Sequence, residues 1–171
     1  MDLAQISDPV GKVRAFLESV SYDKEIVHTD ETIFTVTDAS RVVGAPPEEI
    51  LKSLLFRVET DAGEEWTLAL MSGSNRVHDK AIKRILGARK IRMGTADAIR
   101  EFSGFEPGGV PPVGYPAQPR TLLDRDLFKY ATVWSAAGSD HDFFPISPGR
   151  LLEITGGTAE DIKKYDYPIV S

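Results

Sequence analysis

The sequence predicts a single α+β domain in which a mixed β-sheet or small barrel is surrounded by helices. Apolar residues recur at helical spacing in some segments and gather in short β-rich runs in others, so both element types are interspersed along the 171 residues. Several neighbouring strands are separated only by a short turn, which does not fit the regular strand–helix alternation of a doubly wound sheet. The length suits one domain, and residues 1–171 are assigned to it.

Capping residues define the predicted helices. Asp8 followed by proline is typical of a helix start, and the apolar residues after it predict an N-terminal helix at about residues 9–20. Thr37 or Asp38 is the expected N-cap of a short helix that ends at Gly44. Further helical segments are expected at 46–49, 80–86, 95–104 and from 147 onward.

Strands are predicted where β-branched, aromatic and aliphatic residues cluster between turn-forming residues. Residues 53–58 and 66–71 are expected to pair as a hairpin through the acidic, glycine-containing link at 60–64. Two short β-rich pieces, 26–27 and 33–36, are expected on either side of a turn. The remaining strands are expected at 90–93, 121–123, 132–136 and 143–146.

Charge is unevenly distributed along the chain. The formal net charge of −6 argues against a protein that neutralises many phosphates along nucleic acid, but it allows contact with the tip of an RNA. Residues 76–92 nevertheless carry seven cations and a single acid, Asp79. Such a run is typical of a solvated helix face, and it also suits a surface that faces RNA.

Cysteine is absent, which excludes disulfides, thiolate zinc sites and a cysteine nucleophile. The first residues lack a secretory signal pattern, and no window approaches the roughly 20 apolar residues that span a bilayer. We therefore expect a cytoplasmic protein without a membrane partner.

Standard catalytic and nucleotide-binding motifs are also absent, and the three histidines are scattered. The Asp-His-Asp sequence at 140–142 could hold a metal, but adjacent residues rarely aim their side chains at one point. Ser139 with His141 could form a nucleophile–base pair, but a two-residue spacing rarely gives the required hydrogen bond. We expect neither of these sites.

Two features carry stronger chemical indications. Lys52 lies between a helical turn and a predicted buried strand, where a lysine needs an anionic or carbonyl partner; alternatively, it caps the preceding turn at the surface. Residues 105–119 lack any regular pattern. Within them, GGVPPVG at 108–114 combines paired glycines, which let a ligand approach the backbone, with prolines that stiffen it. This segment is either a surface turn or, as is commoner for irregular segments of this length, a functional one.

Four segments match, in order and spacing, the pattern of a known family. They are TDASRVVG at 37–44, ILKSLLF at 50–56, GGVPPVG at 108–114, and a C-terminal group of LDRDL at 123–127, AAGS at 136–139 and Ser-Pro at 147–148. On these residues the chain resembles the YbaK/EbsC family, which is related to the editing domain inserted in bacterial prolyl-tRNA synthetases. The resemblance covers about residues 33–155.

The resemblance implies a trans-editing hydrolase that removes a small amino acid, such as alanine or serine, from mischarged tRNA. It implies no cofactor and no metal. The implied partner is the acceptor end of aminoacyl-tRNA, with an aminoacyl-tRNA synthetase as a further partner. The implied catalytic residues are Lys52, Gly108 and Gly109; the substrate-binding residues are Thr35, Pro111, Gly138 and Ser139; and the tRNA-binding residues are Lys80, Lys83 and Arg84.

Two points remain open at this stage. Residues 138–141 differ from the pattern of the cysteine-specific branch, which makes Cys-tRNA the less suitable substrate. A competing interpretation is a non-catalytic module that binds a tRNA acceptor end or a small nucleotide-like ligand in the same cleft.

Overall fold

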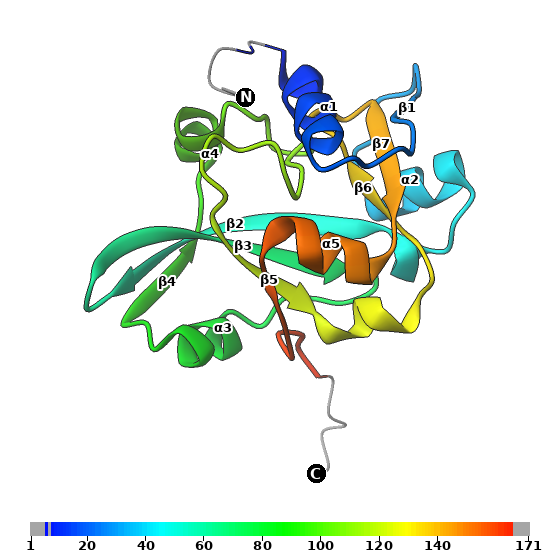
Figure 1. Cartoon of the computed structure of the whole chain (residues 1–171). Coiled ribbons are helices and arrows are strands. Elements are labelled where there is room, and N and C mark those ends of the chain that lie inside the picture. Colours follow the sequence, from blue (N-terminus) through cyan, green and yellow to red (C-terminus); the bar gives the residue numbers. More distant parts are fainter. Residues whose placement is uncertain (1–5, 7, 166–171) are drawn as a thin grey trace.

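The computed structural model describes residue 6 and residues 8–165. Their strands form two β-sheets with helices packed around them (Figure 1). The helices are α1 (Pro9–Ser19), α2 (Val36–Val43), α3 (Asp79–Leu86), α4 (Ala96–Ser103) and α5 (Pro148–Thr155), with 3-10 turns η2 (Pro47–Glu49) and η3 (Arg125–Lys129). The strands are β1 (Val27–His28), β2 (Leu51–Thr60), β3 (Gly63–Ser72), β4 (Lys90–Met93), β5 (Arg120–Asp124), β6 (Val133–Ala136), β7 (Asp142–Ile146) and β8 (Thr158–Glu160). Across the described residues, every helix is too short or too polar to traverse a bilayer.

The larger sheet has five strands in the order β4-β2-β3-β5-β8. β2 and β3 form an antiparallel hairpin in which Leu51 pairs with Ser72 and Thr60 pairs with Gly63. β4 adds antiparallel to β2, whereas β5 and β8 add in parallel beyond β3. The sheet is therefore mixed, and the predicted α+β class is confirmed.

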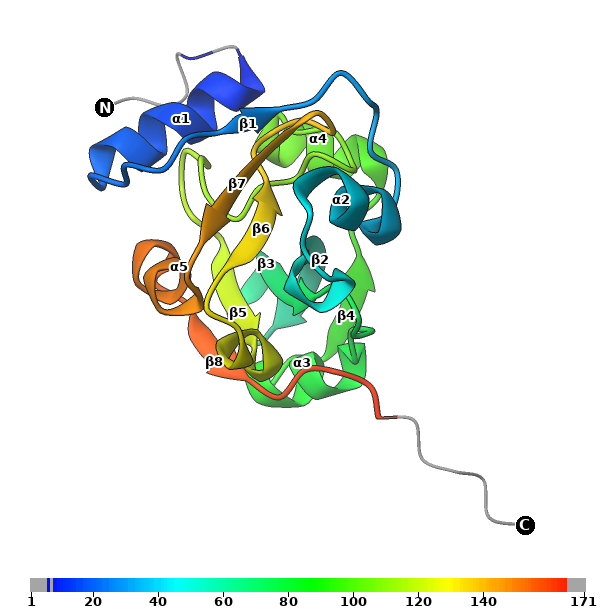
Figure 2. The ribbon, with the colours of Figure 1, turned by 90° about the vertical axis from the view of Figure 1, so that its right-hand side faces the viewer.

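The smaller sheet has three antiparallel strands in the order β1-β7-β6. It meets the larger sheet where Ile50, just before β2, forms a parallel bridge with Trp134 of β6. This bridge places the start of β2 beside β6 (Figure 2). Within residues 8–165 the strands form two sheets and do not close into a barrel. Of the two predicted arrangements, the mixed sheet is the correct one.

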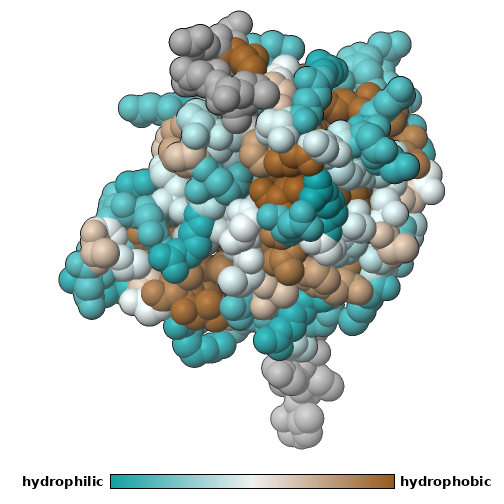
Figure 3. Space-filling model, in the orientation of Figure 1, coloured by the Kyte–Doolittle hydropathy of each residue, from teal (hydrophilic) through white to brown (hydrophobic). Residues whose placement is uncertain are grey.

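Both faces of the larger sheet are buried. Leu68 and Leu70 of β3 belong to the main core, which lies between the two sheets and also contains side chains of α1 and α5. Ala69 and Met71 belong to a second cluster on the opposite face, where Ile82 of α3 covers them. On the face shown in Figure 3, the remaining apolar surface forms separate clusters among hydrophilic side chains.

Most predicted elements are present, and the differences have local causes. Residues 33–36 do not form the predicted strand, because Val36 already begins α2. Thr35, rather than Thr37 or Asp38, is the N-cap, and its hydroxyl accepts a 3.1 Å hydrogen bond from the Asp38 N–H. β8 has no counterpart in the sequence prediction, because its residues, Thr-Ala-Glu, show no apolar alternation.

The irregular segment before β5 packs closely against the turn between β6 and β7. A Cβ atom added at Gly109 would lie 2.7 Å from Cα of Ser139, closer than real side chains pack. Gly138 is equally tight, since an added Cβ would lie 2.7 Å from the carbonyl oxygen of Pro9, and its φ of +100° favours glycine. The missing side chains therefore let this segment, the turn and α1 pack together.

Gly109→Ala is expected to lower the free energy of unfolding by about 1–3 kcal/mol, because the added methyl group must displace the backbone of Ser139. Urea unfolding at neutral pH measures the change. Gly149→Ala is the matched control, since a Cβ at this position in α5 has no neighbour within 4 Å and alanine favours a helix. Equal stability of the two variants would contradict the close packing at Gly109.

Candidate functional site

A cavity of about 400 Å³ opens between α2 and the start of β2, where the two sheets meet. Three of the expected site residues, Thr35, Lys52 and Gly108, line it. Lys52 is the one charged side chain among its described lining residues. The apolar lining residues are Ile33, Phe34, Val36, Ala39, Ile50, Leu51, Leu54, Val110, Ala136 and Phe143. Segments far apart in sequence thus form one apolar hollow with a single cation.

Lys52, the second residue of β2, is partly buried. Its ammonium donates a hydrogen bond to the backbone carbonyl oxygen of Asn75, in the loop after β3. Burial lowers the pKa of Lys52, while the nearby carboxylate of Asp124 favours the charged form. The lysine therefore has the carbonyl partner that its position requires, and this partner comes from a loop rather than from the preceding 3-10 turn.

Two carboxylates hold Asn75 in place. Its side-chain amide donates hydrogen bonds to Oδ2 of Asp124 at 2.8 Å and to Oδ2 of Asp126 at 2.9 Å. The same Asp124 oxygen accepts a 3.1 Å hydrogen bond from the Ser72 N–H, so the loop is closed onto the end of β5. These bonds fix the direction in which the Asn75 carbonyl faces Lys52.

Asp126 connects this network to the C-terminal part of the chain. Lys163 donates a 2.6 Å hydrogen bond to its Oδ2, and Nζ of Lys129 lies 3.1 Å from its Oδ1. Burial alone would raise the pKa of Asp126, but hydrogen bonds from Lys163, Asn75 and Lys129 outweigh it and lower the pKa to about 2. The carboxylate is therefore ionised at neutral pH, as its cationic neighbours require.

The rim of the cavity carries an exposed aromatic side chain. Phe34 lines the cavity and is nevertheless 83% exposed. The hydroxyl of the next residue, Thr35, is already occupied as the N-cap of α2. The ring of Phe34 is therefore accessible at the cavity.

The glycine–proline segment contributes less to the cavity wall than expected. Only Gly108, which has a φ of +94°, and Val110 line the cavity. Gly109 and Pro111 are buried behind it, and the carbonyl of Pro111 accepts a 2.8 Å hydrogen bond from the Tyr115 hydroxyl. The segment is therefore a rigid support that presents Gly108 to the cavity.

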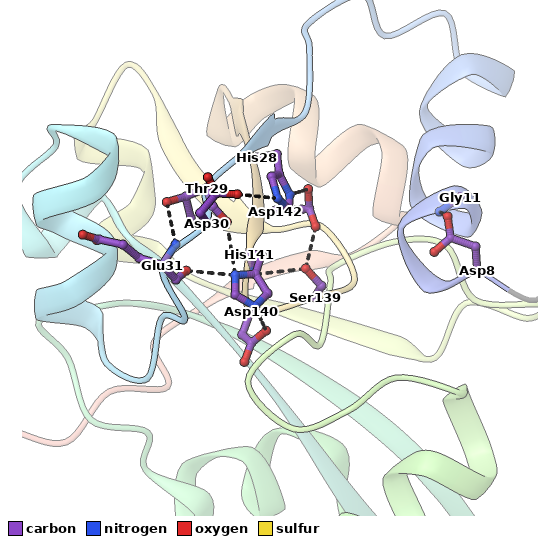
Figure 4. Close-up of polar contacts among 10 residues, drawn as sticks. All are labelled: Asp8, Gly11, His28, Thr29, Asp30, Glu31, Ser139, Asp140, His141 and Asp142. Atoms are coloured by element: carbon purple, nitrogen blue, oxygen red, sulfur yellow. Dashed lines mark hydrogen bonds and ion pairs between the residues drawn. The ribbon is translucent and has the colours of Figure 1, made fainter.

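Gly138 and Ser139 also lie behind the cavity wall, in the turn between β6 and β7. The Ser139 hydroxyl donates a 2.6 Å hydrogen bond to Oδ2 of Asp142, whose Oδ1 lies 2.9 Å from Nδ1 of His28 (Figure 4). The hydrogen bond between the His28 ring and the Asp142 carboxylate raises the pKa of His28. Ser139 thus ties the turn to β1 and supports the site from outside.

The ring of His141 has partners other than Ser139. Its Nδ1 lies 2.9 Å from the carbonyl oxygen of Glu31 and 3.1 Å from that of Thr29, and only its backbone N–H reaches the Ser139 hydroxyl. No nucleophile–base pair is therefore formed at Ser139. Within the described residues, no group of three potential ligands is arranged to hold a metal.

The three cations expected to contact tRNA lie on a different surface. Lys80, Lys83 and Arg84 are exposed on α3, which covers the face of the larger sheet turned away from the main core. They do not line the cavity at Lys52. The structure therefore brings together Lys52, Thr35 and Gly108, and separates the helix cations from them.

Comparison with known proteins assigns the chain to a family. The model of the aminoacyl-tRNA editing domain matches residues 30–154, a range that includes the entire cavity lining. The chain belongs to this family. The uncharacterised protein YwhH of Bacillus subtilis (strain 168) is 29% identical over 143 residues, which are 84% of this chain and 88% of that protein. A proline–tRNA ligase of Bacillus pumilus is 28% identical over 131 residues, or 76% of this chain, but this stretch is only 22% of the ligase.

Solved structures share the fold over nearly the whole chain. The crystal structure of a candidate trans-editing enzyme for prolyl-tRNA synthetase has a TM-score of 0.84 and 33% identity, covering 94% of this chain and 100% of that one. The hypothetical protein APE2540 has a TM-score of 0.81 and 25% identity, covering 90% of this chain and 99% of that one.

Three residues at the site have no counterpart among those expected from the sequence. Asn75 acts through its backbone carbonyl, which no side-chain pattern reveals. Asp124 does lie in a matching segment, LDRDL, where two acids beside a strand were an available signal. Nothing in the sequence indicates that Phe34, in a run of β-forming residues, is left in solvent.

Asp126→Asn is expected to lower the free energy of unfolding at pH 7 by about 1–2 kcal/mol. The pKa of about 2 in the folded protein lies below the ordinary value of 3.8, so the ionised carboxylate stabilises the fold above pH 4. This contribution is lost as the pH falls towards 2, and the two proteins should converge there. Urea unfolding at several pH values measures the difference. Asp61→Asn, at a 96% exposed carboxylate, is the control, and a pH-independent difference for Asp126→Asn would contradict the assignment.

Proposed function

We propose that this protein hydrolyses the ester bond between a small amino acid, such as alanine or serine, and the terminal adenosine of a mischarged tRNA. The observation that carries the proposal is the cavity that Lys52, as the single cation of its described lining, and Gly108 both line. Membership of the aminoacyl-tRNA editing family supports the substrate class, and the candidate trans-editing enzyme of the same fold supports action on a free mischarged tRNA.

The proposed reaction requires few catalytic groups from the protein. In this proposal, a water oxygen attacks the carbonyl carbon, the ester C–O bond breaks, and the ribose oxygen leaves with a proton. The products are the free amino acid and the uncharged tRNA. The ester is already activated, so orienting the water and stabilising the developing oxyanion suffice.

Lys52 is the proposed electrostatic element. Its ammonium uses one donor on Asn75 and has two more, which can bind the terminal phosphate or the substrate carbonyl. In an apolar wall, such a cation interacts more strongly with an anion than it does in water. The backbone at Gly108 is the proposed partner for the ester region and the water, with Gly109, Gly138 and Ser139 holding it from behind. The neighbouring ribose hydroxyl of the substrate is the proposed proton carrier.

Amino acid selection in this proposal is steric. The cavity of about 400 Å³ is lined by packed, buried side chains such as Ile50 and Phe143, which are 4% and 5% exposed. One methylene contributes only about 1–3 kcal/mol by attraction, so exclusion of larger side chains must carry most of the discrimination. Pocket walls of this kind suit a small aminoacyl group.

Phe34 is the proposed stacking surface for a base of the acceptor end. An aromatic ring stacks on any nucleobase and contributes about 1–3 kcal/mol per base. Its position on the rim of the cavity matches a substrate whose aminoacyl group lies inside and whose adenine lies outside.

The second candidate function is a non-catalytic module that binds an acceptor end in the same cavity. The cation and the apolar wall serve binding as well as hydrolysis, so the two functions differ in turnover alone. A panel of Ala-, Ser-, Thr-, Pro- and Cys-tRNA distinguishes them. Binding without turnover across the panel would establish the module.

Lys52→Ala is expected to reduce kcat/KM for the preferred mischarged tRNA by about 100-fold or more, because the cation in the cavity is removed. Deacylation is followed by release of the labelled amino acid. The melting temperature should stay close to that of the wild type, since removing a partly buried ammonium leaves only the Asn75 carbonyl to solvate. Lys24→Ala, an exposed lysine after α1, is the matched control. A folded Lys52→Ala protein with normal turnover would refute the assignment.

Phe34→Ala is expected to raise KM for mischarged tRNA by about tenfold, because one stacked base loses its partner. Phe128→Ala is the control, since Phe128 is also aromatic and 40% exposed but lies outside the cavity lining. Steady-state kinetics of both variants provide the comparison. Identical KM values for the two would argue against stacking at Phe34 and leave the hydrolytic proposal intact.

A further inference from the structure

A second groove lies on the side of the molecule that carries α3. It has a volume of about 480 Å³ and is lined by parts of two segments far apart in sequence, 76–84 and 161–165. Its described lining includes four cations: Arg76, Arg84, Lys163 and Lys164. The basic run noted in the sequence supplies two of them, and the C-terminal part of the chain supplies the other two.

Main-chain hydrogen bonds hold the two segments together. Val77 forms an antiparallel bridge with Lys163, the His78 N–H donates to the Ile162 carbonyl at 2.7 Å, and the Lys164 N–H donates to the Arg76 carbonyl at 2.8 Å. In both Figure 1 and Figure 2, α3 and the segment after β8 lie at the same end of the molecule. These main-chain hydrogen bonds hold the two cation-bearing segments next to each other, so the groove is part of the fold.

The cations of the groove are not all neutralised. Lys163 pairs with Asp126 at 2.6 Å, and the one acid of the described lining, Asp161, accepts a 2.7 Å hydrogen bond from Tyr165. Arg84 and Lys164 are exposed and make no ion pair with any residue in the described part of the chain. A chain with a net charge of −6 repels a polyanion as a whole, so a site for a polyanion requires a local concentration of cations such as this one.

The groove adjoins the candidate catalytic lysine. Arg76 directly follows Asn75, whose carbonyl accepts the hydrogen bond from Lys52. Lys80 and Lys83 add further exposed cations on α3 beside the groove. The hydrogen bond from Lys52 to Asn75 and the next residue, Arg76, therefore connect the cavity to the groove, although the two share no lining residue.

We propose that this groove binds the phosphate backbone of the tRNA acceptor arm, with Arg84 and Lys164 as its principal phosphate contacts. The proposal rests on the proposed function, which puts the 3′ end of the arm in the cavity at Lys52. Contacts of this kind position the RNA without reading its sequence, and their affinity falls as salt rises.

Charge reversal at the two exposed cations tests the groove. The Arg84→Glu/Lys164→Glu double variant is compared with Arg14→Glu/Lys24→Glu, which reverses two exposed cations in and just after α1. Binding of an uncharged acceptor-stem RNA hairpin is measured by fluorescence anisotropy at several salt concentrations. The groove variant should bind about tenfold or more weakly, and the slope of log affinity against log salt should fall by about 2. With mischarged tRNA, KM should rise more than kcat falls.

The outcomes separate this proposal from the proposed function. Wild-type affinity in the groove variant, or an equal loss in the α1 variant, overturns the groove even if the protein deacylates tRNA. A salt-dependent loss in the groove variant supports the groove even if the wild type has no deacylase activity. The milder Arg84→Gln/Lys164→Gln variant guards against misfolding and should show a smaller loss in the same direction. A loss that does not depend on salt overturns the proposal.

Discussion

The hydrogen bond from Lys52 to the Asn75 carbonyl is the interaction on which the site depends. An ammonium at the start of a buried strand loses hydration, and the fold tolerates it only if a polar group replaces that water. The carbonyl can do so only while the loop after β3 keeps its shape. Asp124 and Asp126 impose that shape through the Asn75 amide, so a cation in an apolar wall depends on two carboxylates that never reach the cavity.

This arrangement explains why the site is so sparsely equipped. A single positive charge surrounded by apolar side chains acts in a medium of low polarity, where its field is weakly screened. Besides Lys52, the polar side chains of the described lining are those of Thr35 and Ser53, and the hydroxyl of Thr35 is already engaged as the N-cap of α2. A buried polar network is stable when its members are satisfied, and here the Asn75 amide is satisfied by Asp124 and Asp126 while its carbonyl accepts the hydrogen bond from Lys52.

Sequence reasoning succeeded where a residue type fixes its own surroundings. The hairpin of β2 and β3, the strand at Lys90–Met93 and the helix ends at glycine follow from patterns within a few residues. Lys52 and Gly108 could be identified in the same way, and the fold brings them to one cavity. The sequence predictions fail where residues far apart in sequence determine the local structure. Thr35 caps a helix although it lies in a β-rich run, and Asn75 acts through its main-chain carbonyl. Gly109 lies outside the cavity lining because it packs against Ser139 in the turn between β6 and β7.

Pairing of residues 162–164 with residues 76–78 has a thermodynamic consequence. The match to the model of the editing domain ends at residue 154, and residues 162–164 beyond it fasten the loop that orients Lys52. The pairing of residues 162–164 and the orientation of the Asn75 carbonyl are therefore connected through the main chain of the loop. If this pairing opened, the loop that carries the Asn75 carbonyl would lose its main-chain anchor, so a ligand that binds only the oriented Lys52 would stabilise the pairing by thermodynamic linkage.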